Sequence, residues 1–192
     1  ILNSLPKKEI KAGYAEIIKH ALIKDYSFFC WLETNAQEIF KLNNSILEKA
    51  IYKSNIIKLF YVKKDEKEFL FNNSSRAILN FGHTFGHAIE AYNNYKNITH
   101  GAAITLGMVI ASKLSFYEGH IKDYQLDNII NMIESLGLNT DHSKYSYSKL
   151  KKYMASDKKV KDGKLNLILI DKKFNAFKTS KYNIKNIKSA LD

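Results

Sequence analysis

Helical periodicity is the feature that most constrains the fold of this chain. In segment 45–62 the apolar residues recur at helical spacing, at Ile46, Leu47, Ala50, Ile51, Ile57 and Tyr61. Pro6 is the only proline, and the alternation typical of strands is rare before residue 158. The sequence therefore predicts a mainly α fold, with residues 1–192 forming one multi-helix domain without internal repeats or linkers.

The same patterns predict the individual elements. We expect helices over 7–25, 45–62, 76–92, 100–119, 123–137 and 148–156, with a short closing helix over 183–192. The polar, turn-rich segment 65–75 predicts a loop. Asp162-Gly163 stands between two extended runs, which predicts a small β-hairpin near the C-terminus.

Charge narrows the class of partner. The net charge is +11, yet Arg76 is the only arginine among 30 basic residues. Dispersed lysines are typical of a solvated surface, whereas a nucleic-acid groove favours arginine and clustered aromatic residues. We therefore expect no nucleic-acid partner. A small anionic substrate remains, and Arg76 suits it because a planar guanidinium grips a carboxylate or phosphate with two hydrogen bonds.

The cysteine count and the length of the apolar stretches indicate the expected compartment and the expected relation to membranes. Cys30 is the only cysteine, so no disulfide forms within the chain, and a reducing cytoplasm is the expected location. The strongly apolar stretch 101–114 is too short to span a bilayer and contains Lys113. We find no signal peptide and expect no membrane partner.

The stretch ILNFGHTFGHAIE, residues 78–90, carries the clearest chemical signal. His83 and His87 lie four apart, so on a helix they share one face. Gly82 and Gly86 repeat this spacing and allow a backbone or a ligand to approach closely. Two interpretations remain open: a site that brings two imidazoles near a ligand, or tight helix packing with incidental histidines.

Further residues extend this candidate site. His100 is expected at the start of the next helix, and catalytic zinc sites commonly use three protein ligands. Glu16 lies in an apolar helix, where a charge needs a partner, and Lys19 shares its helical face. His20 also shares that face, but we interpret it as an ordinary surface contact. We likewise expect the two histidines in polar contexts, His120 and His142, at the surface.

Several segments together resemble the 3-dehydroquinate synthase family. Residues 76–90, RAILNFGHTFGHAIE, resemble its signature. The other matches follow in the family's order: AGYAEIIKHALIKD (12–25), SNIIKLFYVKKDEKE (54–68), HGAAITLGM (100–108) and MASDKKVKDGKLNLIL (154–169). The resemblance implies the fold of the family's C-terminal, metal- and substrate-binding domain, and it covers most of residues 6–170.

The resemblance also implies roles for individual residues. It assigns Glu16, His83 and His100 as ligands of zinc or cobalt. It makes His87, Lys19, Lys58 and Glu68 catalytic. It gives contacts with the substrate to Arg76, Asn80, Lys158 and Lys159, with Arg76 and Lys58 suited to a carboxylate, and with Asn80, His87 and one of the two later lysines suited to a phosphate.

The implied activity is that of an NAD- and metal-dependent lyase. The family converts 3-deoxy-D-arabino-heptulosonate 7-phosphate to 3-dehydroquinate and phosphate, in the shikimate pathway of aromatic amino acid biosynthesis. It is usually a homodimer. In this family NAD is bound mainly by an N-terminal α/β domain. This chain contains no glycine-rich nucleotide loop, so we expect that domain to be absent from it and the isolated chain to be inactive.

Two departures from the family pattern keep other interpretations open. Ala102 occupies the position of a glutamate in the family, and the loop between Glu68 and Arg76 is longer than usual. The alternatives are a related sugar-phosphate cyclase, such as 2-deoxy-scyllo-inosose synthase, and a non-catalytic helical domain.

Overall fold

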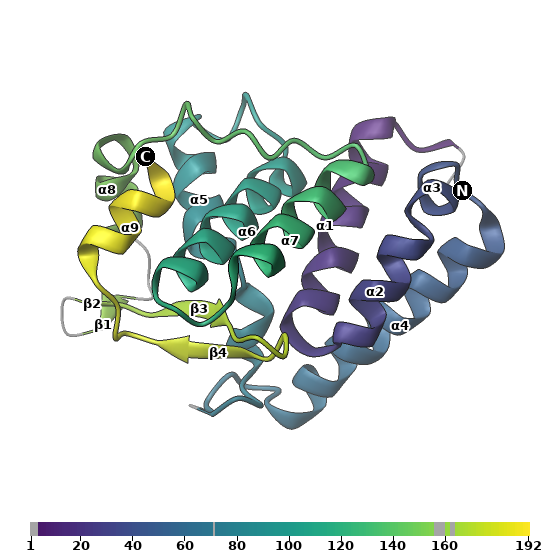
Figure 1. The fold of residues 1–192 in the computed structure, drawn as a ribbon, viewed down its shortest axis with the longest axis horizontal. Coiled ribbons are helices and arrows are strands. Elements are labelled where there is room, and N and C mark those ends of the chain that lie inside the picture. The colour runs from purple at the N-terminus through teal and green to yellow at the C-terminus, as the bar shows by residue number, and fades with distance from the viewer. Residues whose placement is uncertain (1–3, 71, 156–159, 162–163) are drawn as a thin grey trace.

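Helices dominate the computed structural model, which describes residues 4–70, 72–155, 160–161 and 164–192 (Figure 1). Its α-helices are α1 (Lys7–Lys24), α2 (Tyr26–Thr34), α3 (Ala36–Phe40), α4 (Asn44–Lys64), α5 (His83–Tyr92), α6 (His100–Tyr117), α7 (Asp123–Ser135), α8 (Tyr147–Ala155) and α9 (Ile184–Leu191). Its strands are β1 (Val160–Lys161), β2 (Lys164–Leu165), β3 (Leu167–Ile170) and β4 (Ala176–Thr179). The predicted mainly α fold is confirmed.

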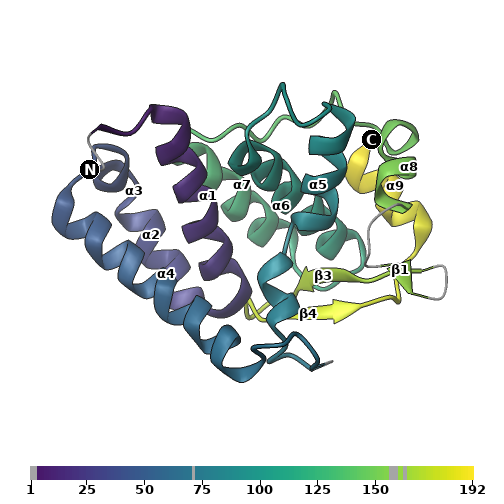
Figure 2. The ribbon, with the colours of Figure 1, turned by 180° about the vertical axis from the view of Figure 1, so that it is seen from behind.

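Helix α6 lies at the centre of the fold. It is buried along nearly its whole length, and it packs against α1, α5, α7, α9 and strand β3. Figures 1 and 2 show α1, α2 and α4 grouped at one end of the molecule and the strands, α8 and α9 at the other. The helices that carry the candidate site, α1 and α5, therefore both pack on α6.

Glycines allow α5 and α6 to approach closely. A Cβ atom at Gly107 of α6 would overlap the carbonyl oxygen of Gly82 and would lie 2.7 Å from the amide nitrogen of Gly86. Only a residue without a side chain fits such a contact between two backbones. The close approach of a backbone that these glycines allow is thus observed, and this contact brings the first turn of α5 beside α6.

The single helix predicted over 76–92 is wrong. Arg76–Asn80 forms a short 3₁₀ helix, and α5 begins only at His83, after Gly82 with φ of 79°. A positive φ interrupts a right-handed helix and favours glycine. Arg76 and Asn80 therefore belong to a separate turn, while His83 lies in the first turn of α5.

Other elements also differ from the prediction. Helices α2 and α3 and strand β4 were not predicted. The Asp25 side chain accepts a hydrogen bond from the Phe28 amide at 2.8 Å and so caps α2. Strands β3 and β4 form an antiparallel hairpin in addition to the pair β1 and β2. The predicted turn Asp162-Gly163 lies outside the described residues. Within the described residues, no helix is long and apolar enough to cross a membrane.

Candidate metal and substrate site

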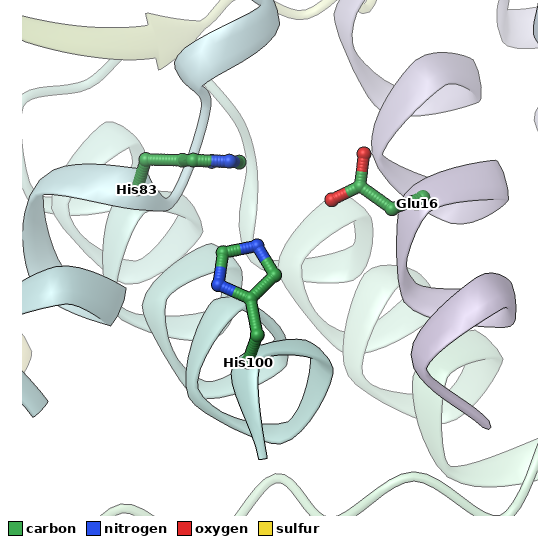
Figure 3. A group of neighbouring side chains, drawn as sticks. All are labelled: Glu16, His83 and His100. Atoms are coloured by element: carbon green, nitrogen blue, oxygen red, sulfur yellow. The ribbon is translucent and has the colours of Figure 1, made fainter. Parts of the chain in front are cut away.

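Glu16, His83 and His100 converge from three helices. One ligand atom from each, a carboxylate oxygen or an imidazole nitrogen, lies within 4.8 Å of the other two. Figure 3 shows the carboxylate of Glu16 on α1 facing the two rings, with one nitrogen of His100 turned toward the other two side chains. The structure thus brings together the three residues predicted as metal ligands.

Hydrogen bonds fix the tautomers of the two histidines. His83 Nδ1 lies 3.2 Å from the carbonyl oxygen of Phe81, and His100 Nδ1 lies 3.1 Å from Oε1 of Glu90. A carbonyl oxygen and an ionised carboxylate only accept hydrogen bonds, so each Nδ1–H is the donor. In a neutral imidazole the lone pair is then on Nε2 of both rings, which is the state that binds a metal ion.

Lys19 contacts the carboxylate of the cluster. Its Nζ lies 2.7 Å from Oε2 of Glu16, and the lysine side chain is only 4% exposed. Burial lowers the pKa of Lys19, while the charge of Glu16 opposes this shift and nearby Lys58 adds to it. Glu16, whose charge in an apolar helix was expected to need a partner, therefore has one in Lys19. Burial favours the neutral form of this lysine.

His87 lies beside the cluster. Its ring centroid is 5.3 Å from that of His83 and 6.3 Å from that of His100. The group of mutually close ligand atoms among the described residues contains Glu16, His83 and His100 but not His87. His87 thus lies outside this group, and its catalytic or substrate-contacting role stays a prediction.

A polar pocket of about 210 Å³ adjoins the cluster. Its lining contains five residues predicted to contact the substrate or act in catalysis: Lys19, Lys58, Glu68, Arg76 and Asn80. Glu16, His20, Leu79 and His83 complete the lining. These residues come from α1, α4, the loop after α4, the 3₁₀ helix and α5, so the fold joins segments that are distant in the sequence. Lys158 and Lys159 lie outside the described residues.

Asp65 organises the loop that carries Glu68 and leads to Arg76, a role that sequence reasoning missed. Its carboxylate accepts hydrogen bonds from the backbone amides of Phe69, Leu70 and Arg76, at 2.7 to 3.3 Å. Desolvation by burial acts to raise the pKa of Asp65, but these amides outweigh it, so the pKa is lowered. The sequence signal was an acidic residue at the end of a helix, just before the loop.

Two histidines expected at the surface are buried instead. His20 is 4% exposed, and its Nδ1 lies 2.6 Å from Oγ of Ser54 on α4. Burial, followed by the charge of Lys19, lowers the pKa of His20 to about 4. His142 is 6% exposed and its Nε2 lies 2.9 Å from Nζ of Lys113. The polar sequence around His142 gave no sign of its contact with Lys113 on α6.

Comparison with known proteins identifies the family. The family described as 3-dehydroquinate synthase C-terminal matches residues 13–160. A 3-dehydroquinate synthase of Saccharophagus degradans is 41% identical over 192 residues, which are 100% of this chain and 52% of the relative. Another from Teredinibacter turnerae is 44% identical over 170 residues, 88% of this chain and 46% of the relative. The chain belongs to the 3-dehydroquinate synthase family and corresponds to its C-terminal domain.

Solved structures support the fold. A 2-epi-5-epi-valiolone synthase from Streptomyces hygroscopicus, with NAD⁺ and Zn²⁺ bound, matches with a TM-score of 0.85 at 22% identity, over 98% of this chain and 51% of that one. A 2-deoxy-scyllo-inosose synthase with carbaglucose-6-phosphate, NAD⁺ and Co²⁺ matches with a TM-score of 0.67, also at 22% identity, over 98% of this chain and 52% of that one. The chain spans about half the length of the curated relatives it matches.

Proposed function

We propose that this chain is the metal- and substrate-binding part of a 3-dehydroquinate synthase. The reaction eliminates phosphate from 3-deoxy-D-arabino-heptulosonate 7-phosphate and yields 3-dehydroquinate. The observation that carries the proposal is the junction of the cluster Glu16, His83 and His100 with a pocket lined by the predicted lysines and Arg76. Identities of 41% and 44% to 3-dehydroquinate synthases, against 22% to the other cyclases, favour this substrate.

The donor set suits a divalent metal ion. One carboxylate oxygen and two imidazole nitrogens with fixed tautomers are ligands that zinc and cobalt accept, and three protein ligands leave a position for the substrate. The bound ion would supply Lewis acidity toward hydroxyl oxygens of the substrate. In this proposal Glu16, His83 and His100 would hold the ion, and the Nζ of Lys19 lies 2.7 Å from Oε2 of Glu16.

The remaining residues hold the anionic substrate. Arg76 and Lys58 face the pocket and suit the substrate carboxylate, because both are cations and Arg76 offers a planar fork of donors. Asn80 and His87, with Lys158 or Lys159, suit the phosphate. Lys19, Lys58, Glu68 and His87 are the proposed catalytic residues. Lys19 is the best candidate for proton transfer, since burial lowers the pKa of its ammonium group and its Nζ lies beside Glu16.

In this proposal NAD is bound by a different domain from the one described here. The family's reaction uses NAD to oxidise a ring hydroxyl and later to reduce the carbonyl again. We propose that an N-terminal domain binds NAD, that the isolated chain does not turn over substrate, and that the complete enzyme is a homodimer in the cytoplasm, acting in the shikimate pathway.

A chimeric enzyme tests this function. The N-terminal half of the Saccharophagus degradans relative is joined to this chain, which aligns with the remaining 52% of that protein. With NAD and zinc, we expect phosphate release from the heptulosonate phosphate, and no release by this chain alone. His83→Ala should abolish the activity, and Glu48→Gln, at an exposed site on α4, should retain it.

The alternatives predict other outcomes in the same assay. A related cyclase would prefer a sugar phosphate such as glucose 6-phosphate over the heptulosonate phosphate. A non-catalytic helical domain would bind no zinc and would be indifferent to Arg76→Lys. We expect Arg76→Lys to raise KM, because an ammonium group cannot make the two parallel hydrogen bonds of a guanidinium.

A further inference from the structure

Glu90 contacts one of the proposed metal ligands from a buried position. Its side chain is 12% exposed, in the last turn of α5, and its Oε1 lies 3.1 Å from Nδ1 of His100. The His100 side chain is 54% exposed, in the first turn of α6. A carboxylate held by the protein interior therefore fixes a ring that is otherwise half open to solvent.

The connection between α5 and α6 holds these two residues at a set separation. The backbone carbonyl of Glu90 accepts a hydrogen bond from the Tyr95 amide at 2.9 Å. The side-chain amide of Asn93 donates to the Ile89 carbonyl at 2.7 Å and to the Tyr145 hydroxyl at 3.0 Å. At the far end of the connection, the Thr99 hydroxyl caps α6 by accepting from the Ala102 amide. Both ends of the segment are thus anchored.

The two histidines of the cluster differ in their outer partners. His83 donates its Nδ1–H to a neutral carbonyl, whereas His100 donates to a carboxylate. A carboxylate partner makes the imidazole more basic and thus a stronger ligand, in addition to selecting its tautomer. Together with the carboxylate of Glu16, it gives the site two negative charges to balance a divalent ion.

We infer that Glu90 is a positioning residue for metal binding: it holds His100 in the Nδ1–H tautomer and raises the affinity of the site for zinc. This inference rests on the proposed function only in assigning Glu16, His83 and His100 as the metal ligands. Glu90 itself does not touch the ion or the substrate in this assignment. Its effect is exerted through the ring of His100.

Two substitutions separate the hydrogen bond from the charge. In Glu90→Gln the side-chain carbonyl still accepts from Nδ1–H, so the tautomer is kept while the charge is lost. In Glu90→Ala both are lost, and the ring is released. Glu48→Gln removes the same charge from an exposed site on α4 and serves as the control.

The measurements are the zinc dissociation constant by calorimetry and the tautomer of His100 by ¹⁵N NMR on the metal-free chain. We expect zinc to bind about 10- to 100-fold more weakly to Glu90→Ala, with a smaller loss in Glu90→Gln and none in Glu48→Gln. The NMR spectrum should show the Nδ1–H tautomer in the wild type and in Glu90→Gln, and a mixture in Glu90→Ala. Circular dichroism verifies that each variant is folded.

The outcomes distinguish this inference from the function on which it rests. Zinc binding by the wild type that is lost in His83→Ala but unchanged in Glu90→Ala would overturn the role of Glu90 alone. An Nε2–H tautomer of His100 in the wild type would do the same, even if Glu90→Ala failed to fold. Absence of specific zinc binding by the wild type would overturn the proposed metal site itself, and the role of Glu90 with it.

Discussion

The Nζ of Lys19 lies 2.7 Å from Oε2 of Glu16, in a site where the lysine is almost completely buried. The contact places a cation beside the carboxylate that we propose as a metal ligand. Burial lowers the pKa of Lys19, and the charge of Glu16 opposes this shift. This pair connects the proposed metal ligands with the adjoining polar pocket.

Lys19→Met tests whether Lys19 acts in catalysis while Glu16 binds the metal ion. Loss of the ammonium group removes a charge that repels a metal ion, so zinc should bind more tightly, by less than about tenfold. Turnover by the chimeric enzyme should fall about 100-fold or more, because a group placed for proton transfer is lost. Calorimetry and the phosphate-release assay measure the two effects. Lys8→Met, at an exposed site on the same helix, is the control; wild-type turnover by Lys19→Met would contradict the catalytic role.

The contact between α5 and α6 gives a prediction about stability and metal binding together. A methyl group at Gly107 would overlap the backbone of Gly82, so Gly107→Ala should lower the free energy of unfolding by about 1 to 3 kcal/mol. It should also weaken zinc binding, since α5 carries His83. Gly13→Ala is the matched control: no atom lies within 4 Å of its added Cβ, and α1 should gain up to about 1 kcal/mol. Urea titrations measure both, and equal stability of the two variants would contradict this packing.

The sequence predicted most helices because their apolar faces are long and regular. The prediction failed at Gly82, where the apolar helical pattern continues although the helix itself is interrupted. The interruption lies where the backbone of α6 packs against Gly82. The prediction failed for His20 and His142 because burial of a polar side chain depends on partners distant in the sequence, Ser54 and Lys113. Local patterns carry no information about such partners.

The site residues were predicted by motif and resemblance, and the structure shows why spacing alone left His87 ambiguous. His83 and His87 share a face, but the position of Glu16 on α1 determines which of them joins the cluster. Glu90 was within reach of sequence reasoning, since it follows His83 by seven residues and thus shares its side of the helix. Its contact with His100 depends on the course of the connection to α6.

The hydrogen bonds of Asp65 give a prediction about the loop between α4 and the 3₁₀ helix that begins at Arg76. In Asp65→Asn an amide replaces a carboxylate that accepts from three backbone amides, so the loop should loosen. We expect faster proteolysis within 66–74 and a higher KM of the chimera, with zinc affinity unchanged. Glu66→Gln, at an exposed position in the same loop, should match the wild type. Proteolysis of Asp65→Asn at the wild-type rate would contradict this role.

The lowered pKa of buried His20 predicts that the free energy of unfolding depends on pH. Its pKa is lowered to about 4 in the folded chain, from 6.5 for the ordinary side chain, first by burial. As the pH falls, the imidazole of His20 is therefore protonated in the unfolded chain before it is protonated in the folded chain. The folded state has its full stability with respect to this group above pH 6.5, and that stability is lost as the pH falls toward 4. The loss reaches about 3 kcal/mol at most.

Urea unfolding of the metal-free chain across this range of pH measures the effect. His20→Gln should reduce the slope of unfolding free energy against pH. Ser54→Ala removes the hydrogen-bond partner but keeps the buried imidazole, so most of the slope should remain, since burial is the largest cause of the shift. An unchanged slope in His20→Gln would show that His20 does not titrate as described.

The measurement that tests the central claim most directly is zinc binding by calorimetry to the metal-stripped chain, with His83→Ala and His20→Gln beside it. Both histidines line the same pocket, but only His83 belongs to the cluster with Glu16 and His100. We predict one zinc ion per wild-type chain, binding lost in His83→Ala and kept in His20→Gln. No specific binding by the wild type, or binding that survives in His83→Ala, would contradict the account.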